Sequence, residues 1–536
     1  MTNGGEGAPT PAPPSCLSPR RGPMSAPDAT PFPLRDDAPS GVLPTPRAPA
    51  DPLGVLAGTG DGSAVGGTGD GSAVGVVEAL PAPAGPQVDT TAEAGAVEVP
   101  RSRHRYVPVA AKFLVAVVGA ALWVTLAVVL SRPWIAELTP VVGPVGAFVV
   151  VGLVAYLPGA VVAFLAVSLA LDRQPPLRSS DATSAVTVVV AARNEQEGIV
   201  ATLESVARVE YAGELTIVLA DNGSTDATVE RALAAAPTLG VPLRVVHEAT
   251  PGKAHALNAA LATVTTPLVV TVDADTLLHR EALGRLVARL EAAPADTVAV
   301  AGSVLVRNSR RNFLTRMQEW DYYLGITAVK RMQGLYQSTL VAQGAFSVYR
   351  TEDVREVGGW PDAIGEDIVV TWRLMEAGRR VFFEPTAVAF TDAPERVRHF
   401  FRQRARWARG MLEGIRAVPP WRQERVLTKF VAGIDLLIPL LDVGYALIWL
   451  PGLVLFLLGH PLVVSMWTLA VLPVTLLVYG GLRIFQSRHV FAPLDLRVRR
   501  NRLGYIGFLL LYQVLCSTAS LVGYTQFLGG TRRRWK

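Results

Sequence analysis

Two aspartates, Asp273 and Asp275, are separated by one residue and directly follow the apolar run 268–272. Because side chains alternate along a strand, this spacing directs both carboxylates toward the same side of a sheet edge. Hard cations such as Mg²⁺ or Mn²⁺ take oxygen ligands, and one or two carboxylates with a diphosphate form a typical shell. A loop with two solvated aspartates is the alternative. The position after a buried strand favours metal binding.

A second acidic pair, Glu366 and Asp367, follows Gly365 and opens an amphipathic helix that runs through Trp372 and Leu374. Acidic residues at a helix start can simply complement the helix dipole. A carboxylate shielded from water can instead have its pKa raised enough to act as a base toward an acceptor hydroxyl. Local residues leave both interpretations open, and the pair is a catalytic candidate.

Further polar residues stand where a ligand would meet the edge of the sheet. Asn194 and Glu195 follow one predicted strand, and Asp221 follows the next. Asp221 can accept a uracil-ring N–H, although its cluster also fits a turn with a helix cap from Ser224. Lys253 opens a helix whose free N–H groups are available to oxyanions, and an ordinary helix start with a solvated lysine is the alternative.

A predicted helix that starts near Pro394 contains Gln403, Arg406 and Trp407. Residues three and four positions apart share a helix face, so these three side chains are grouped. Trp offers a flat apolar face to a sugar ring, and Arg suits a diphosphate. A basic helix beside a membrane, with one interfacial Trp, is the alternative interpretation.

These residues fall in a middle region, 185–421, that alternates short β-branched runs with helical patterns. Such alternation is typical of a mostly parallel sheet covered by helices. In open α/β sheets, ligands bind at the carboxyl ends of the strands, so we expect the polar clusters to meet there. The first four predicted strands are residues 186–191, 215–220, 243–247 and 268–273.

Five apolar runs flank the middle region, two before it and three after it. The first has no charge and approaches the ~20 residues that span a hydrocarbon core. The second is longer than one span requires and contains Pro144 and Pro158, so we expect a tilted or kinked helix. The runs are residues 113–130, 141–171, 430–458, 463–482 and 503–528.

Basic residues next to these runs predict which side of the membrane each flank occupies. Arg173 and Arg178 follow the second run, and further basic residues precede the first, so both flanks and the middle region should be cytoplasmic. Five spans then leave the basic C-terminus, 531–536, outside, against the same rule. Asp435 and Asp442 suggest that the third run is partly interfacial or contains two passes. We expect five spans within 106–172 and 422–530.

Composition excludes other classes of protein. Residues 1–105 are rich in Pro, Gly and Ala and carry a tandem nine-residue repeat, so we expect a disordered tail. The net charge of +5 does not indicate nucleic-acid binding, because much of the excess Arg sits beside apolar runs. Cys16 and Cys516 are the only cysteines, which excludes a disulfide framework and a CxxC metal site.

Five motifs occur in the order Asn194-Glu195, Asp221, Asp273-Ala274-Asp275, Glu366-Asp367 and Gln403-x-x-Arg406-Trp407. This order resembles that of processive family 2 glycosyltransferases, which include cellulose, chitin, hyaluronan and poly-N-acetylglucosamine synthases. Bacterial poly-β-1,6-N-acetylglucosamine synthases are the most similar. The stretches that carry this likeness are residues 252–258, residues 366–374, and 394–395 leading into 403–407. The resemblance covers residues 185 to about 411. The motif set identifies the superfamily much more specifically than it identifies the sugar that is transferred.

This resemblance implies a GT-A-type nucleotide-sugar domain inserted between transmembrane helices of the cell membrane. The donor would be a UDP-sugar, with Mg²⁺ or Mn²⁺ as cofactor and a glycan as acceptor. The resemblance identifies no partner protein for export of the product. A single in-line displacement would invert the anomer from α to β. The implied roles are Asp367 and Glu366 in catalysis; Asn194, Glu195, Asp221, Lys253 and Asp273 at the donor; Asp273 and Asp275 on the metal; and Gln403, Arg406 and Trp407 at the acceptor and diphosphate.

Two departures from the family pattern bear on the donor and the linkage. The second cluster reads Ala-Asp-Asn-Gly where Asp-Asp-Gly is frequent, and Gly365 stands where Thr is often found. The leading hypothesis is a synthase that feeds a β-linked polymer, built of N-acetylglucosamine, through its own spans. One alternative is a non-processive enzyme that adds one sugar to a lipid or short acceptor. The other is an inactive membrane scaffold, although no aspartate of the motifs is missing.

Overall fold

The computed structural model describes residues 75–78, 107–174, 177–497 and 500–530, all within the unit Asp70–Lys536. The predicted disordered tail therefore lies outside the described residues, apart from four. These four form strand β1, which pairs antiparallel with β4. The strands are β1 (Gly75–Glu78), β2 (Val186–Ala192), β3 (Leu215–Asp221), β4 (Leu243–His247), β5 (Leu268–Asp273), β6 (Leu277–Leu278), β7 (Thr297–Val306), β8 (Phe346–Arg350) and β9 (Arg380–Thr391).

The strands form one mixed sheet in the order β1-β4-β3-β2-β5-β8-β7-β9-β6. Strands β4, β3, β2 and β5 run parallel, which brings their carboxyl ends to one edge. Strand β8 runs antiparallel to both β5 and β7, and β9 returns parallel to β7. The edge that carries the predicted clusters is thus extended by the ends of β7 and β9.

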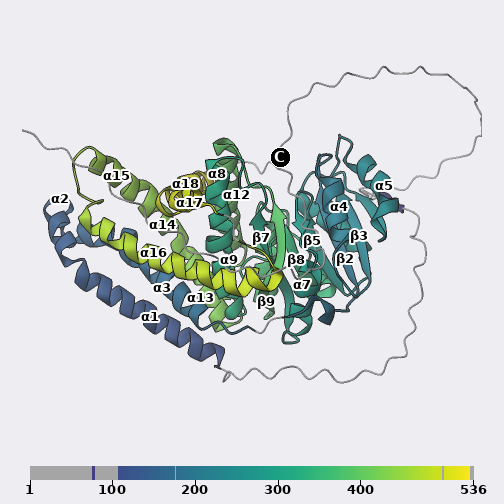
Figure 1. The fold of residues 1–536 in the computed structure, drawn as a ribbon, viewed down its shortest axis with the longest axis horizontal. Helices are drawn as coiled ribbons and strands as arrows, with labels where there is room; N and C mark the ends of the chain where they lie inside the picture. Colours follow the sequence, from purple (N-terminus) through teal and green to yellow (C-terminus); the bar gives the residue numbers. More distant parts are fainter. Residues whose placement is uncertain (1–74, 79–106, 175–176, 498–499, 531–536) are drawn as a thin grey trace, which may run out of the picture. The chain divides into compact units, whose positions relative to one another are not determined.

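Helices cover both faces of the sheet, because its strands are apolar on both sides. Val188 and Val190 point into one core and Val189 into the other, as alternation along a strand requires. Figure 1 shows α4, α5 and α7 against the sheet. The helical elements of this region are α4 (Ile199–Ala207), α5 (Thr228–Leu239), α6 (Lys253–Thr263), α7 (Ala282–Glu291), α8 (Phe313–Trp320), the π-helical turn η3 (Asp321–Ile326), α9 (Thr327–Leu335), α10 (Thr351–Glu356), α11 (Glu366–Glu376) and α12 (Val397–Ala417).

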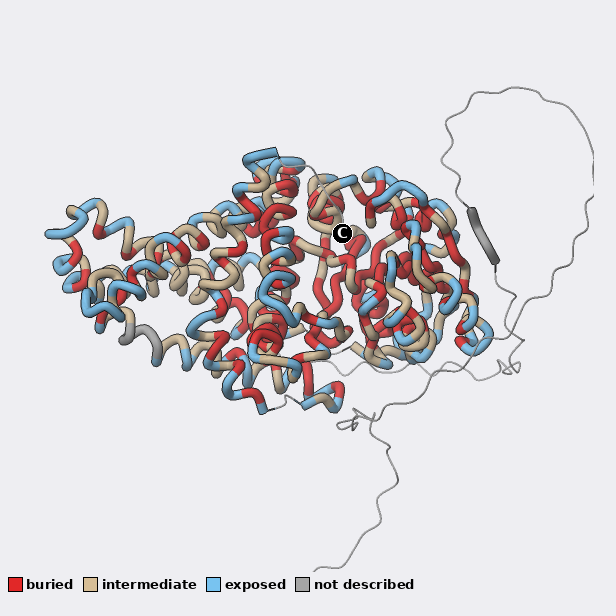
Figure 2. The backbone as a smooth tube through the Cα atoms, turned by 90° about the horizontal axis from the view of Figure 1, so that it is seen from above, coloured by how far each residue is buried: buried red, intermediate tan, exposed pale blue. Residues whose placement is uncertain are grey.

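Five helical runs of the described chain are long and apolar enough to cross a membrane. They comprise α1 (Val109–Leu130); α2 (Arg132–Val151), η1 (Gly152–Tyr156) and α3 (Leu157–Ala170); α13 (Val426–Ile434), η5 (Asp435–Leu437), α14 (Ile438–Val443), η6 (Gly444–Trp449) and α15 (Leu450–Leu457); α16 (Met466–Gln486), η7 (Ser487–Phe491) and η8 (Ala492–Leu494); and α17 (Arg502–Gly507), η9 (Phe508–Tyr512) and α18 (Gln513–Leu528). Figure 2 shows the buried, red stretches gathered around the sheet, whereas these runs are mostly tan and blue. Apolar side chains such as Leu122, 66% exposed, and Leu477, 75% exposed, are the surface that lipid would cover.

The second and third runs differ in detail from the expected ones. The second begins at Arg132 rather than near residue 141, because Pro133 suits the first turn of a helix. It bends at Gly143, whose φ of 75° breaks the helix between two prolines. The third is one continuous helical run of 32 residues, so the described chain does not show two passes there. Inside it, buried Asp442 accepts hydrogen bonds from side chains of α18.

A buried ion pair joins the end of the second run to α9. The Arg331 Nε donates to Asp172 Oδ2 at 2.6 Å, and both side chains are at most 5% exposed. The Arg331 guanidinium also lies 4.7 Å from the centre of the Phe485 ring. One turn earlier on α3, Ser168 is hydrogen-bonded to the Tyr336 hydroxyl at 2.7 Å. These contacts hold α3 against α9.

Replacing Arg331 with Met should lower the free energy of unfolding by about 3–5 kcal/mol, because it leaves the Asp172 carboxylate buried without its counter-ion. The measurement is the thermal midpoint of the detergent-purified protein. The double variant Asp172→Leu/Arg331→Met removes both charges and should regain most of the loss. A single variant as stable as the wild type would contradict the importance of this ion pair.

Candidate functional site

Lys253, the first residue of α6, joins two of the predicted clusters at the carboxyl edge of the sheet. Its Nζ forms an ion pair with Asp273 Oδ1 and lies 3.8 Å from Glu366 Oε1. The neighbouring Asp367 accepts a hydrogen bond from the Gly344 N–H at 3.4 Å through Oδ2. A Cβ at Gly344 would lie 2.6 Å from Lys253 Nζ, so a larger residue would push the ammonium away. The aspartate motif and the acidic pair of α11 are therefore one site.

The charges of this cluster are strongly coupled because most of them are withdrawn from water. Burial raises the pKa of Glu366 to about 7, an effect that Lys253 opposes and Asp367 reinforces. Burial also disfavours the charged form of Lys253, but the carboxylates of Asp273, Glu366 and Asp367 outweigh this and raise its pKa. Lys253 is thus a cation that is paired with protein carboxylates, and its contact with an oxyanion of the donor stays a prediction.

Asp273 and Asp275 form an acidic pair that fits a divalent cation. Burial and the negative charge of Asp273 raise the pKa of Asp275, an effect that hydrogen bonds with Thr391 and Thr276 and the charge of Lys253 oppose. Burial, followed by the carboxylates of Asp275, Asp226 and Asp273, raises the pKa of Glu195 to about 7. The described residues contain no cluster of three or more His, Cys, Asp or Glu side chains that could hold a metal. The two carboxylates are oxygen ligands of the kind that Mg²⁺ and Mn²⁺ take, and a diphosphate would have to supply further ligands.

Asp221 ends β3 and is buried at the donor side of the edge. Its Oδ1 accepts from the Ser224 N–H at 3.1 Å, and its Oδ2 lies 3.1 Å from His247 Nδ1 on the end of β4. These contacts fix the carboxylate at the position predicted for a nucleobase. Sequence reasoning did not identify His247 as a member of this site, because no local motif includes it.

The unusual asparagine of the second cluster, Asn222, holds the loop before α6. Its Nδ2 donates to the Thr250 carbonyl at 2.7 Å and to the Glu248 carbonyl at 3.3 Å, while its Oδ1 accepts from the Gly252 N–H at 2.8 Å. An ionised aspartate could not donate to these carbonyls. The departure from the frequent Asp-Asp-Gly pattern therefore has a structural function here, because it places Lys253.

Asn194 joins the loop that follows β2 to the loop that follows β3 through hydrogen bonds. Its φ of 58° lies in the left-handed region, which asparagine tolerates better than most residues. The Asn194 Oδ1 accepts from the Thr225 N–H at 2.8 Å, and the Asn194 N–H donates to Ser224 Oγ at 3.0 Å. Its side chain thus shapes the donor-side loops, and the adjacent Glu195 is the member of the predicted pair that is coupled to the aspartates.

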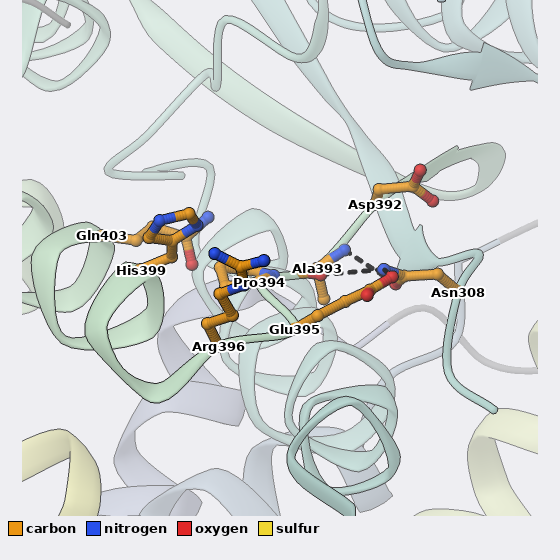
Figure 3. Close-up of a pocket in the computed structure, with 8 residues that line it drawn as sticks. All are labelled: Asn308, Asp392, Ala393, Pro394, Glu395, Arg396, His399 and Gln403. Atoms are coloured by element: carbon orange, nitrogen blue, oxygen red, sulfur yellow. Dashed lines mark hydrogen bonds between the residues drawn. The ribbon is translucent and has the colours of Figure 1, made fainter. Parts of the chain in front are cut away.

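The three predicted residues of α12 lie near one another but do not have the same surroundings. Gln403 lines an open groove of about 380 Å³, and its Oε1 is buried without a partner among the described residues. Figure 3 shows Gln403 and His399 on the helix, opposite the loop that follows β9. Arg406 is exposed, and Trp407 is 38% exposed. The groove is lined by Asn308, Asp392, Ala393, Pro394, Glu395, Arg396, His399 and Gln403.

Trp407 lies beside Tyr322, which the sequence did not single out. The two ring centres are 6.3 Å apart. Burial raises the pKa of Tyr322 to about 12, and both Asp275 and Arg406 act on it electrostatically. Tyr322 belongs to η3, 85 residues before Trp407 along the chain. Contact between Tyr322 and Trp407 therefore joins η3 to α12.

Lys330 on α9 is a second cation near the acidic pair that sequence reasoning missed. Its Nζ donates to the Val341 carbonyl at 2.9 Å. Burial lowers its pKa to about 7, against the opposing effect of Asp367. A lone lysine in a helical pattern has no signal that distinguishes it from a surface residue.

Comparison with known proteins is consistent with this geometry. The family description "Glycosyltransferase like family 2" matches residues 183–410. The poly-β-1,6-N-acetyl-D-glucosamine synthase of Staphylococcus aureus strain COL is 31% identical over 241 residues, which are 45% of this chain and 57% of the relative. That of Staphylococcus epidermidis is 30% identical over 226 residues, 42% of this chain and 54% of the relative. The chain thus spans little more than half the length of these relatives.

Among solved structures, a mannosyltransferase from Pyrobaculum calidifontis, in complex with GDP-Man and Mn²⁺, is 20% identical. The match covers 72% of this chain and 99% of the mannosyltransferase chain, with a TM-score of 0.49. The matched family residues include each sequence-predicted site residue, from Asn194 to Trp407. Residues 183–410 are a glycosyltransferase domain of family 2.

Proposed function

We propose that this protein is an inverting membrane glycosyltransferase that transfers N-acetylglucosamine from a UDP-sugar to a growing β-linked polysaccharide. The observation that carries the proposal is the position of Lys253. By pairing with Asp273 and approaching Glu366, it places the metal candidates beside the candidate base. The relatives that are about 30% identical are polysaccharide synthases, which supports polymerisation and this sugar.

In a single displacement reaction, some residues of the site bind the donor and others act on the acceptor. Asp221 would bind the uracil, and Asp273 and Asp275 would hold Mg²⁺ or Mn²⁺. Such a cation, when bound, would supply positive charge that stabilises the leaving UDP. Asp367 accepts the proton of the acceptor hydroxyl while the new glycosidic bond forms and the bond between the sugar and the diphosphate breaks. Arg406 faces the diphosphate, and Trp407 offers its ring to the acceptor sugar.

The helical runs support a multi-pass protein of the cell membrane with a cytoplasmic catalytic domain. Five runs are long and apolar enough to span, and Arg173, Arg178 and the basic residues of the segment 483–502 flank them. Nucleotide sugars are made in the cytoplasm of cells, so a cytoplasmic site meets its donor directly. A polymer made there would leave through the apolar helices that contact the domain.

Product length separates polymer synthesis from single addition. Detergent-purified protein is incubated with UDP-N-acetylglucosamine, Mn²⁺ and a short oligosaccharide, and the products are sized by mass spectrometry. We expect a broad series of products extended by many residues while most of the oligosaccharide is unused. A single product, longer by one sugar, would replace this proposal with the non-processive alternative.

Activity should rise as the pH increases through about 7, because ionised Glu366 adds a second negative charge that helps to hold Lys253 in the site. Burial raises the pKa of Glu366 to about 7, so the carboxyl is largely protonated below that pH and ionised above it. Charges that face it are Lys253 from α6, Asp273 from β5 and Asp367 from its own helix. UDP release from pH 5.5 to 8.5, compared between wild type and Glu366→Gln, measures this. An identical acidic limb in both proteins would assign the titration to another group.

A further inference from the structure

A buried guanidinium lies directly beneath the exposed ring of Trp407. Arg404 precedes Trp407 by one helical turn, and its side chain is only 7% exposed. Its Nη2 donates to Asp321 Oδ2 at 3.0 Å and to the Tyr512 hydroxyl at 2.6 Å. The Tyr512 hydroxyl in turn donates to Asp321 Oδ2 at 3.0 Å. Each group of this triangle is therefore oriented by the other two.

The Arg404 guanidinium is enclosed by aromatic rings, and its shortest ring contact is with Trp407. Its Cζ lies 4.0 Å from the centre of the Trp407 ring, compared with 5.3–5.8 Å from the rings of Phe400, Tyr322 and Tyr512. A cation held at this distance attracts the electron-rich face of an indole. Trp407 keeps 38% of its surface exposed, so part of the ring stays open to a ligand.

The triangle joins three elements that are distant along the chain. Arg404 belongs to α12, Asp321 opens the π-helical turn η3, and Tyr512 belongs to the last apolar run, Arg502–Leu528. In η3, a Cβ at Gly325 would lie 2.7 Å from Asp321 Oδ1, so the small residue leaves room for the carboxylate. Later in the last apolar run, a Cβ at Gly523 would lie 2.2 Å from the Ala405 carbonyl oxygen. The last apolar run and α12 therefore approach each other closely near the triangle.

We infer that Arg404 is a positioning residue that holds Trp407 as the platform for the acceptor sugar, and that Asp321 and Tyr512 tie this platform to the last apolar helix. This rests on the proposed function, in which Trp407 contacts the acceptor. Arg404 itself is buried beneath the ring and has no access to the sugar. Its effect is confined to the acceptor side, because the hydrogen bonds of the triangle, within the described part of the chain, involve none of Lys253, Asp273 and Asp367.

Acceptor and donor kinetics separate this role from a general loss of structure. UDP release is measured with UDP-N-acetylglucosamine and Mn²⁺, with and without a β-1,6-linked N-acetylglucosamine oligosaccharide. In Arg404→Lys and Tyr512→Phe, we expect KM for the oligosaccharide to rise about tenfold, as loss of a desolvated cation–ring contact implies. The KM for the donor, and UDP release without oligosaccharide, should stay within about twofold of wild type.

Two control variants match these substitutions. Tyr505→Phe removes a hydroxyl from the same apolar run, where the ring packs on Trp320 at 4.9 Å instead of joining the triangle. Arg285→Lys alters another buried arginine, which is paired with Glu281 at 2.6 Å on α7. Both should behave as wild type. Equal rises of donor and oligosaccharide KM in Arg404→Lys, or kinetics that match the controls, would overturn the inference.

The placement of Trp407 is also tested without turnover. Subtracting the fluorescence spectrum of Trp407→Phe from that of its parent isolates the emission of this one indole. In the Tyr512→Phe and Arg404→Lys backgrounds, we expect this emission to shift to longer wavelength, whereas the Tyr505→Phe background should leave it unchanged. An unchanged emission in both variants overturns the inference. If the wild type releases no UDP from any donor, the proposed function fails, and the emission still decides whether Arg404 positions the ring.

Discussion

Replacing Asp367 with Asn should reduce turnover by about 10²–10⁴-fold, the usual contribution of a positioned general base. Asn has nearly the same shape, and it can still accept from the Gly344 N–H that holds Oδ2 at 3.4 Å. The amide cannot take the proton of the acceptor hydroxyl. Donor affinity should change little, because the proposed role of Asp367 is to accept the proton of the acceptor hydroxyl. Steady-state UDP release and UDP binding by calorimetry measure the two quantities.

A control for this variant is Asp353→Asn on α10, where the carboxylate is paired with Arg379 Nε at 3.0 Å. It removes the same charge from a helix outside the site and should leave turnover near the wild-type value. Turnover of Asp367→Asn close to that of the control would assign the base to another residue. Parallel loss of turnover and UDP affinity would mean that Asp367 maintains the site rather than taking part in proton transfer.

Replacing Asp275 with Asn should lower turnover at least about a hundredfold, because charge stabilisation by a bound cation is worth several kcal/mol. It should also remove most of the increase in UDP affinity that Mn²⁺ causes. This variant leaves the ion pair between Lys253 and Asp273 in place. Asp273→Asn removes one metal ligand and also releases Lys253, so its loss should be at least as large.

Calorimetric titration of UDP with and without Mn²⁺ is the direct measurement. In the wild type the metal should tighten UDP binding, and in Asp275→Asn the two affinities should converge. If Mn²⁺ strengthened UDP binding equally in both proteins, the cation would be held by other groups, and the two-carboxylate site would be wrong.

Strands β2 to β5 were predictable because their residues form short β-branched runs between turn residues. Their observed bounds differ from the predicted ones by at most one residue, since β2 ends at Ala192 and β3 at Asp221. The later strands gave weaker signals. Strand β7 is rich in small residues, and β9 contains Pro385, which a local pattern disfavours inside a strand. The pairing of β7 with β8 and with β9 depends on tertiary contacts.

The candidate site shows the same division between local and distant information. The residue types and the spacing of Asp273, Asp275 and Asp367 are local features, and they are enough to indicate the chemistry of these carboxylates. The sequence could not show that Lys253 connects them, because an ion pair between α6 and α11 depends on the topology of the sheet. Arg404 and Tyr322 were missed for a related reason, since their contacts join segments separated by more than 80 residues.

The central claim is a metal-dependent transfer from a UDP-sugar, and the most direct test is UDP release by the detergent-purified protein across a panel of UDP-sugars, with Mg²⁺, with Mn²⁺ and with neither. Wild type is compared with Asp273→Asn and Asp367→Asn. We expect the wild type to release UDP from one donor, UDP-N-acetylglucosamine, and only when metal is present. Both variants should lose this activity. Turnover that persists without metal, or in either variant, would contradict the account, as would a wild type that turns over no donor and does not bind UDP.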